Sequence, residues 1–173
     1  IKRFGKDEID AVIKSINKAS LLSGYTNKFL GGEILQKFEK EFARFHNCKY
    51  GISVNSGTSA LFVAQLAAGV KNKTKVSVPP ITFTATISQV IASGGTPSFT
   101  DIDLQSYCMD YDFKNKTKFA IPVHLLGHPC NFEMIKQMKE NEIFVIEDCA
   151  QAMGAKNKNK IVGSMGDCGI FSF

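Results

Sequence analysis

The chain has 173 residues, of which 44% are hydrophobic and 21% are charged, a composition that is typical of a folded domain and excludes an intrinsically disordered chain. The net charge of +5 comes from lysines that alternate with polar residues and have no aromatic rings between them, so we expect no nucleic-acid partner. The five cysteines are widely spaced, and neither a signal peptide nor an apolar run of membrane-spanning length is visible, which predicts a cytoplasmic protein with reduced thiols.

The first 49 residues are predicted to form an N-terminal helical segment. Apolar side chains at helical spacing predict one helix over residues 6–18 and a second over residues 33–45. Residues 20–32 lie between them and contain three glycines among polar residues, which predicts a loop.

Residues 50–173 alternate between expected strands and expected helices. The strands are predicted over residues 50–54, 75–78, 96–101, 118–123, 142–146 and 168–173. The helices are predicted over residues 60–68, 82–93 and 131–141, with a hairpin over residues 153–162. Strands that alternate with helices of this length imply right-handed crossovers, so we predict an α/β fold with a mostly parallel sheet.

One expected strand leads into an acidic residue, Asp148. Residues 143–146 are all apolar, which is typical of a strand buried on both faces of a parallel sheet. Asp148 follows at the carboxyl end of this strand, where ligands bind in open α/β sheets. Because burying an unpaired carboxylate is costly, Asp148 is either a hydrogen-bonded turn residue or the anchor of a ligand that carries positive charge.

Polar clusters follow four of the expected strands, and parallel strands would bring them to one edge of the sheet. These clusters are residues 55–59, residues 81–84, His124 and residues 148–151. Residues 56–59 (SGTS) open a helix, so they form either an anion-binding cradle or an ordinary N-cap. Phe83 is either a core residue or a ring that stacks on a flat heteroaromatic ligand.

His124, His128 and Cys130 resemble a set of metal ligands, but their spacing argues against one. Two histidines four residues apart need a helix to reach the same ion, and Gly127 and Pro129 would break that helix. We therefore predict no metal site, and the alternative is that His124 is a hydrogen-bonded core residue.

Several segments together resemble the DegT/DnrJ/EryC1/StrS family of pyridoxal-phosphate-dependent nucleotide-sugar aminotransferases. The segments are NSGTSAL (55–61), VPPITFTAT (78–86), PVHLLGHPC (122–130), IEDCAQAMGA (146–155) and VGSMGDCGIFSF (162–173). The resemblance implies a three-layer α/β/α architecture, the large domain of fold-type I transferases. That domain would occupy residues 50–173 and would be incomplete, with the C-terminal small domain absent.

The resemblance also implies a set of residues that bind pyridoxal 5'-phosphate. Asp148 would pair with the protonated pyridine nitrogen, and Gln151 would form a hydrogen bond near the phenolic oxygen of the ring. Phe83 would stack on the face of the ring. The residues expected at the phosphate are Gly57, Thr58, Ser59 and Ser172.

The resemblance places the Schiff-base lysine beyond Phe173, so we predict no catalytic residue within the chain and expect a portion of a longer protein. It implies transfer of an amino group from an amino-acid donor such as glutamate to a keto group of a nucleotide-linked deoxy sugar, by a homodimer. Two alternatives stay open. One is a related dehydratase that uses the same cofactor and has histidine in place of the lysine, and the other is a non-catalytic remnant of the fold.

Overall fold

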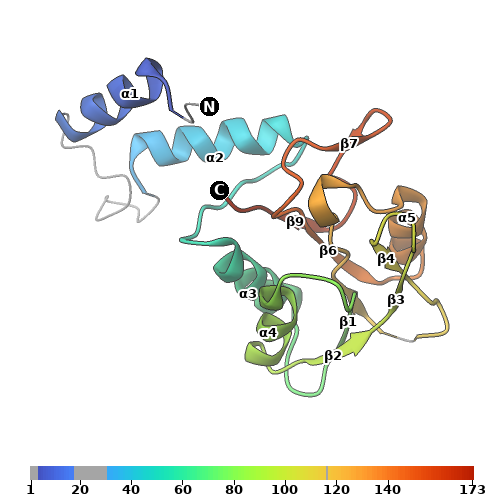
Figure 1. Cartoon of the computed structure of the whole chain (residues 1–173). Coiled ribbons are helices and arrows are strands. Elements are labelled where there is room, and N and C mark those ends of the chain that lie inside the picture. The colour runs from blue at the N-terminus through green and yellow to red at the C-terminus, as the bar shows by residue number, and fades with distance from the viewer. Residues whose placement is uncertain (1–3, 18–30, 116) are drawn as a thin grey trace. The chain divides into compact units, whose positions relative to one another are not determined.

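The computed structural model describes residues 4–17, 31–115 and 117–173 (Figure 1). The loop predicted over residues 20–32 therefore lies almost entirely outside the described residues. The chain divides into two compact units between Ser53 and Val54. The predicted boundary lies between residues 49 and 50, so residues 50–53 belong to the first unit and not to the second. Among the described residues, no helix is both long enough and apolar enough to cross a bilayer.

The first unit contains two helices, α1 (Lys6–Asn17) and α2 (Glu33–Phe45). Each has an acidic residue in its first turn and a basic residue in its last turn, which suits the helix dipole. The strand predicted over residues 50–54 is wrong, because these residues join no ladder in the described part of the chain. Tyr50 and Ile52 are exposed instead, and the amide of Ser53 donates to Glu39 Oε1 at 2.7 Å. The apolar residues of a strand stabilise it only where a neighbouring strand pairs with it.

The second unit is built on a parallel sheet of five strands in the order β2-β1-β5-β6-β9. Every pairing in this sheet is parallel, in line with the alternating pattern of the sequence. The carboxyl ends of its strands therefore lie at one edge. The strands are β1 (Lys75–Val78), β2 (Thr96–Phe99), β5 (Phe119–Ala120), β6 (Phe144–Asp148) and β9 (Cys168–Ile170).

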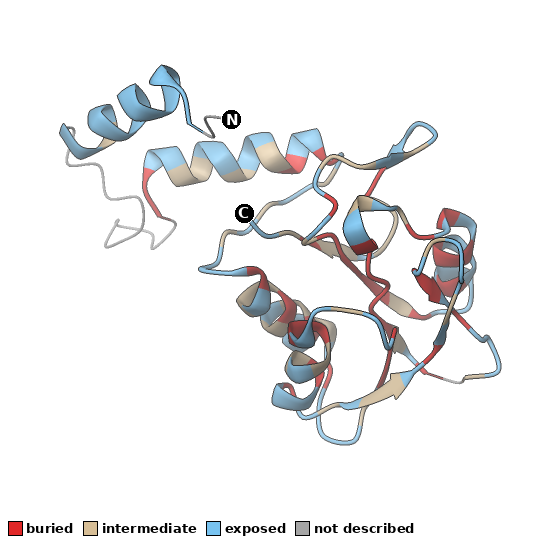
Figure 2. Ribbon diagram, in the orientation of Figure 1, coloured by how far each residue is buried: buried red, intermediate tan, exposed pale blue. Residues whose placement is uncertain are grey.

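Helices cover both faces of the sheet (Figure 1). Leu61 of α3 (Gly57–Ala68) and Val90 of α4 (Thr84–Ala92) pack in one hydrophobic core with Ile146 of β6. Residues of α5 (Phe132–Glu140) form a second core with Val145, the preceding residue of β6. Figure 2 shows the buried residues along the central strands, between the two helical layers. The predicted α/β fold with three layers is confirmed.

Two short antiparallel ladders and a 3-10 turn complete the second unit. The hairpin predicted over residues 153–162 is confirmed as β7 (Lys156–Asn157) and β8 (Lys160–Ile161). The pairing of β3 (Asp101–Ile102) with β4 (Met109–Asp110) was not predicted, because strands of two residues leave no periodic pattern. The turn η1 (Leu125–Gly127) follows His124.

Candidate functional site

The carboxyl ends of β6 and β9 lie side by side, with Asp148 paired to Ile170. Helix α3 contacts both strands, and α4 packs against α3. The first turns of these helices come from the segments that the sequence placed at this edge, residues 55–59 and 81–84. The structure therefore gathers two helix starts and two strand ends in one region.

Side chains of β6 alternate between the two faces of the sheet, which separates its two carboxylates. Asp148 points to the face of α3 and α4, because its Oδ2 accepts a hydrogen bond from Thr86 Oγ1 of α4 at 2.8 Å. Glu147 lies on the opposite face and contacts His124, with 2.9 Å between its Oε2 and the ring Nε2. Neighbouring acidic residues thus belong to separate environments.

Asp148 is a buried carboxylate with only 4% of its surface exposed. Besides the bond from Thr86, its Oδ1 accepts a bond from the amide of Ala150 at 3.2 Å. Burial raises the pKa of Asp148, and the hydrogen bonds from Thr86 and Ala150 offset this rise only in part. In the described part of the chain, no lysine or arginine forms an ion pair with Asp148. The group is therefore suited to binding a cation from outside the chain.

Thr86 is a site residue that the sequence interpretation did not single out. Its hydroxyl lies between two partners, since it donates to Asp148 and also lies 2.8 Å from Thr82 Oγ1. The available signal was its place in the first turn of a helix that follows β1 at the ligand edge. Periodicity could not show which face of that helix meets Asp148.

Gly57 and Ser172 are in direct contact at the start of α3. A β-carbon built on Gly57 would lie 2.9 Å from Ser172 Cβ and 3.2 Å from its Oγ. A larger residue at position 57 would therefore push the end of the chain segment after β9 away from the helix. The predicted phosphate-binding residues Gly57 and Ser172 are brought together by the fold.

Ser56 is the N-cap of α3, and its Oγ accepts a bond from the amide of Ser59 at 3.1 Å. The N-cap interpretation of this segment is therefore confirmed. It is compatible with an anion-binding cradle, because the other early amides of a helix have no partner within the helix. Thr58 is exposed in the same first turn. Helix α3 begins at Gly57, three residues before the predicted start at residue 60, because the cap precedes the apolar pattern.

Phe83 and Gln151 each lie three positions along the chain from one partner of the Thr86–Asp148 hydrogen bond. Phe83 directly precedes α4 and is 68% exposed, so its interpretation as a core residue is wrong. Gln151 follows Asp148 by three residues, and its Oε1 accepts a bond from the amide of Leu126 at 2.8 Å. Leu126 itself adopts a left-handed conformation, with φ of 52°.

His124 is a buried, hydrogen-bonded core residue. Its Nδ1 accepts a bond from the amide of Cys130 at 2.9 Å, so the proton of a neutral ring is on Nε2 and is donated to Glu147. Ligand atoms of His124, Glu147 and Cys149 lie within 4.8 Å of one another, which resembles a metal cluster. Both ring nitrogens of His124 are already engaged by protein groups, so this cluster is better described as part of the core.

The model of the DegT/DnrJ/EryC1/StrS aminotransferase family matches residues 8–173 of the chain. The chain is 42% identical over 148 residues to GDP-perosamine synthase of Escherichia coli O157:H7, an alignment that covers 82% of this chain and 41% of that protein. It is also similar to the aminotransferase from Psychrobacter cryohalolentis, with a TM-score of 0.88 and 36% identity over 98% of this chain and 43% of the other.

Two further solved structures have the same fold. One is the PLP-form of the sugar aminotransferase Spr1654 from Streptococcus pneumoniae, with a TM-score of 0.84, 26% identity and coverage of 98% of this chain and 47% of the other. The other is a variant of GDP-4-keto-6-deoxymannose-3-dehydratase with bound GDP-perosamine, with a TM-score of 0.86, 25% identity and coverage of 99% and 45%. The chain thus spans less than half the length of each of these four proteins.

Proposed function

The chain belongs to the DegT/DnrJ/EryC1/StrS aminotransferase family, and from this premise we propose a function for the whole protein. It uses pyridoxal 5'-phosphate to transfer an amino group from an amino-acid donor, glutamate or a similar acid, to a keto group of a nucleotide-linked deoxy sugar. The relative named GDP-perosamine synthase supports a nucleotide-sugar substrate, and the PLP-form of a structural neighbour supports the cofactor.

The observation that carries this proposal is the buried carboxylate of Asp148. Its raised pKa reflects burial in a site without a lysine or arginine partner among the described residues. The protonated pyridine nitrogen of the cofactor is a cation of the right kind to pair with it, and that pairing would hold Asp148 ionised. The Gly57–Ser172 contact at the start of α3 would suit the phosphate, since the first amides of a helix attract anions. The residues present therefore fit this cofactor.

When bound, pyridoxal phosphate supplies an electron sink for the carbon that loses a proton during amino transfer. Asp148 would keep a proton on the ring nitrogen, and Thr86 would orient the carboxylate through its 2.8 Å bond. Phe83 would cover one face of the ring and exclude water, and Gln151 would donate toward the phenolic oxygen. Gly57, Thr58, Ser59 and Ser172 would hold the phosphate.

A dehydratase that uses the same cofactor is a second candidate function, supported by the structural neighbour of that activity. The two functions differ in the proton-transfer residue expected beyond Phe173, which is lysine in the aminotransferase and histidine in the dehydratase. Asp148 and the Gly57–Ser172 contact would serve either function equally, because both need the cofactor held in the same way.

The test is to supply the purified whole protein with pyridoxal phosphate, glutamate and a nucleotide-linked 4-keto-6-deoxy sugar. We expect the absorption spectrum of the cofactor to change on binding, and an amino sugar to be detected by mass spectrometry. A deoxygenated keto sugar without transferred nitrogen would favour the dehydratase instead. Cofactor binding without turnover of any nucleotide sugar would favour a non-catalytic binding module, and absence of binding would contradict all of these functions.

A further inference from the structure

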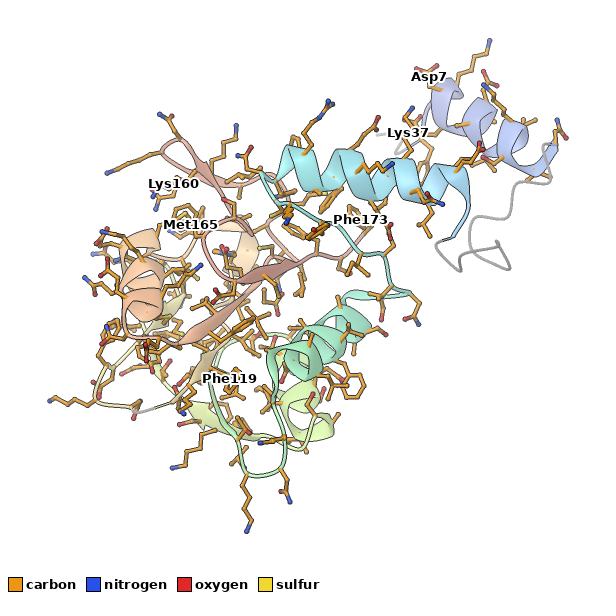
Figure 3. All side chains as sticks on the ribbon, turned by 180° about the vertical axis from the view of Figure 1, so that it is seen from behind. Asp7, Lys37, Phe119, Lys160, Met165 and Phe173 are labelled. Carbon is orange, nitrogen blue, oxygen red and sulfur yellow. The ribbon has the colours of Figure 1, made fainter. Side chains whose placement is uncertain are left out.

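Glu147 is fully buried and accepts four hydrogen bonds, two on each carboxylate oxygen. Its Oε2 accepts from the ring of His124 and from the amide of Gly163, each at 2.9 Å. Its Oε1 accepts from the amides of Met165 at 2.7 Å and Gly166 at 2.6 Å. Three of the four donors thus belong to one short segment, the loop between β8 and β9, which we call the 163–167 loop. Met165 marks this loop in Figure 3.

The carboxylate of Glu147 is ionised, because its donors outweigh the cost of its burial. Burial raises the pKa of Glu147, whereas the bonds from His124, Gly166 and Gly163 lower it, and the net result is a pKa below the ordinary value of 4.5. The ring of His124 supplies one of these donors through Nε2, while its Nδ1 accepts a bond from the amide of Cys130. Each hydrogen bond to a charged acceptor is stronger than one to a neutral acceptor, so the loop is held firmly.

The 163–167 loop is also held against β6 by its last residues. The amide and a side-chain oxygen of Asp167 pair with the carbonyl and amide of Val145, each at 2.8 Å. A β-carbon on Gly166 would lie 2.7 Å from the Val145 carbonyl oxygen, so the loop approaches β6 closely. Strand β9 begins at the next residue, Cys168, and continues to the segment that carries Ser172. The position of the loop therefore sets the position of Ser172.

We propose that Glu147, supported by His124, is a positioning residue for the phosphate-binding end of the site. It anchors the 163–167 loop, which places β9 so that Ser172 meets Gly57 at the start of α3. Glu147 acts from the opposite face of the sheet to Asp148 and does not touch the cofactor itself. This inference rests on the proposed function, because it concerns how tightly the chain holds the phosphate of pyridoxal phosphate.

The test compares two ligands in the whole protein, pyridoxal phosphate and pyridoxal, which lacks the phosphate. In Glu147→Gln, one acceptor oxygen becomes an NH2 group that faces amide donors, so part of the anchor is lost at nearly constant volume. We expect pyridoxal phosphate to bind about tenfold more weakly or worse. Pyridoxal should keep its affinity within about threefold, because Asp148 and Thr86 remain in place. Equilibrium dialysis of both ligands gives the two affinities.

Amide hydrogen exchange supplies a measurement that needs no cofactor. In Glu147→Gln we expect faster amide exchange in the 163–167 loop and also in residues 168–172. If Glu147 held only the loop, the exchange rates of residues 168–172 would stay unchanged. Lys139→Gln is the matched control, because Lys139 contacts the same loop from the surface, 3.3 Å from the Gly166 carbonyl and 3.2 Å from Asp167. Such an exposed contact contributes little, so this control should bind both ligands as the wild type does.

Three results would overturn the inference. They are an unchanged affinity for pyridoxal phosphate in folded Glu147→Gln, an equal loss for both ligands, and exchange that stays slow in residues 168–172. Should Glu147→Gln fail to fold, His124→Gln tests the same anchor. It keeps an N–H donor for Glu147 and loses the acceptor for Cys130, so we expect a smaller loss that is again confined to pyridoxal phosphate. A wild-type protein that binds pyridoxal phosphate no better than pyridoxal would instead overturn the proposed function.

Discussion

Asp148 and Glu147 show how two adjacent carboxylates take opposite protonation tendencies within one strand. Asp148 accepts two hydrogen bonds and its pKa is raised, mainly by burial. Glu147 is buried as deeply, yet four donors keep its pKa below the ordinary value. The larger number of donors contributes to this difference, because each donor replaces part of the hydration that the buried charge loses. Asp148 is therefore suited to binding a cationic ligand, whereas hydrogen bonds within the chain already compensate the buried charge of Glu147.

Asp148→Asn should separate cofactor binding from stability. A carboxyl group whose pKa is higher in the folded than in the unfolded protein destabilises the fold once pH rises above the unfolded pKa. Removing that charge should therefore leave the melting temperature of the cofactor-free protein unchanged or raise it near neutral pH. Binding of pyridoxal phosphate should fall at least about tenfold, because the cationic ring loses its counter-charge. Thermal melting and equilibrium dialysis measure the two effects.

The matched control for this change is Asp112→Asn, which alters an exposed aspartate outside the site. It should leave both the melting temperature and the cofactor affinity as in the wild type. Unaltered cofactor affinity in Asp148→Asn would contradict the proposed pairing of Asp148 with the ring nitrogen.

At the scale of elements, α3 and α5 begin in the same way but serve different purposes. Ser56 caps α3 through one bond to the amide of Ser59, and Asn131 caps α5 through bonds to the amides of Glu133 and Met134. Helix α5 has an acidic residue in its first turn, whereas α3 has none. The first turn of α3 thus has no carboxylate of its own at the positive end of the helix dipole, which favours an external anion there.

Removing each cap should therefore produce equal losses of stability but unequal losses of binding. Ser56→Ala and Asn131→Ala should each lower the free energy of unfolding by about 1 kcal/mol, the usual cost of losing an N-cap side chain. Ser56→Ala should also weaken pyridoxal phosphate binding, because the first turn that would hold the phosphate frays. Urea denaturation and ligand titration of both variants give the comparison. Equal effects of the two variants on cofactor affinity would contradict a phosphate site at α3.

At the scale of the whole molecule, large apolar side chains are exposed in the second unit. Leu126 is 84% exposed, Phe83 68% and Met153 55%. Each belongs to a segment that follows β5, β1 or β6 at the carboxyl edge. Exposed apolar side chains that follow the ends of neighbouring strands favour an interaction surface over solvent. This supports the homodimer that the family resemblance implies.

We accordingly expect the whole protein to be a homodimer in light scattering. Leu126→Glu should weaken the dimer at least about tenfold, since a charge would be buried at an apolar contact. Leu104→Glu is the control, because Leu104 is 79% exposed but lies in the β3–β4 segment. A monomer that transfers amino groups at the full rate would contradict the need for a dimer. Equal effects of the two substitutions would show that Leu126 does not lie in the dimer interface.

The interpretation of the sequence succeeded where short stretches carry the information. The apolar run before Asp148 predicted a buried strand, and the alternation of strands and helices predicted the parallel sheet, because both depend on neighbours along the chain. It failed at residues 50–54, where an apolar stretch finds no pairing strand among the described residues. It also left the role of Glu147 unseen, because an acidic residue inside a strand has no periodic signature.

Local sequence patterns were enough to predict the parallel sheet with its helices, the edge at which polar clusters meet, and the need of Asp148 for a partner. The identity of the groups that contact Asp148 and Glu147 depends on tertiary packing instead. Thr86 reaches Asp148 across 62 positions of the chain, and Glu147 binds amides 16 to 19 positions away. Such contacts arise when β6 is placed between α4 on one face and the 163–167 loop on the other. No local pattern records them, because the closeness of these groups is a property of the packed sheet.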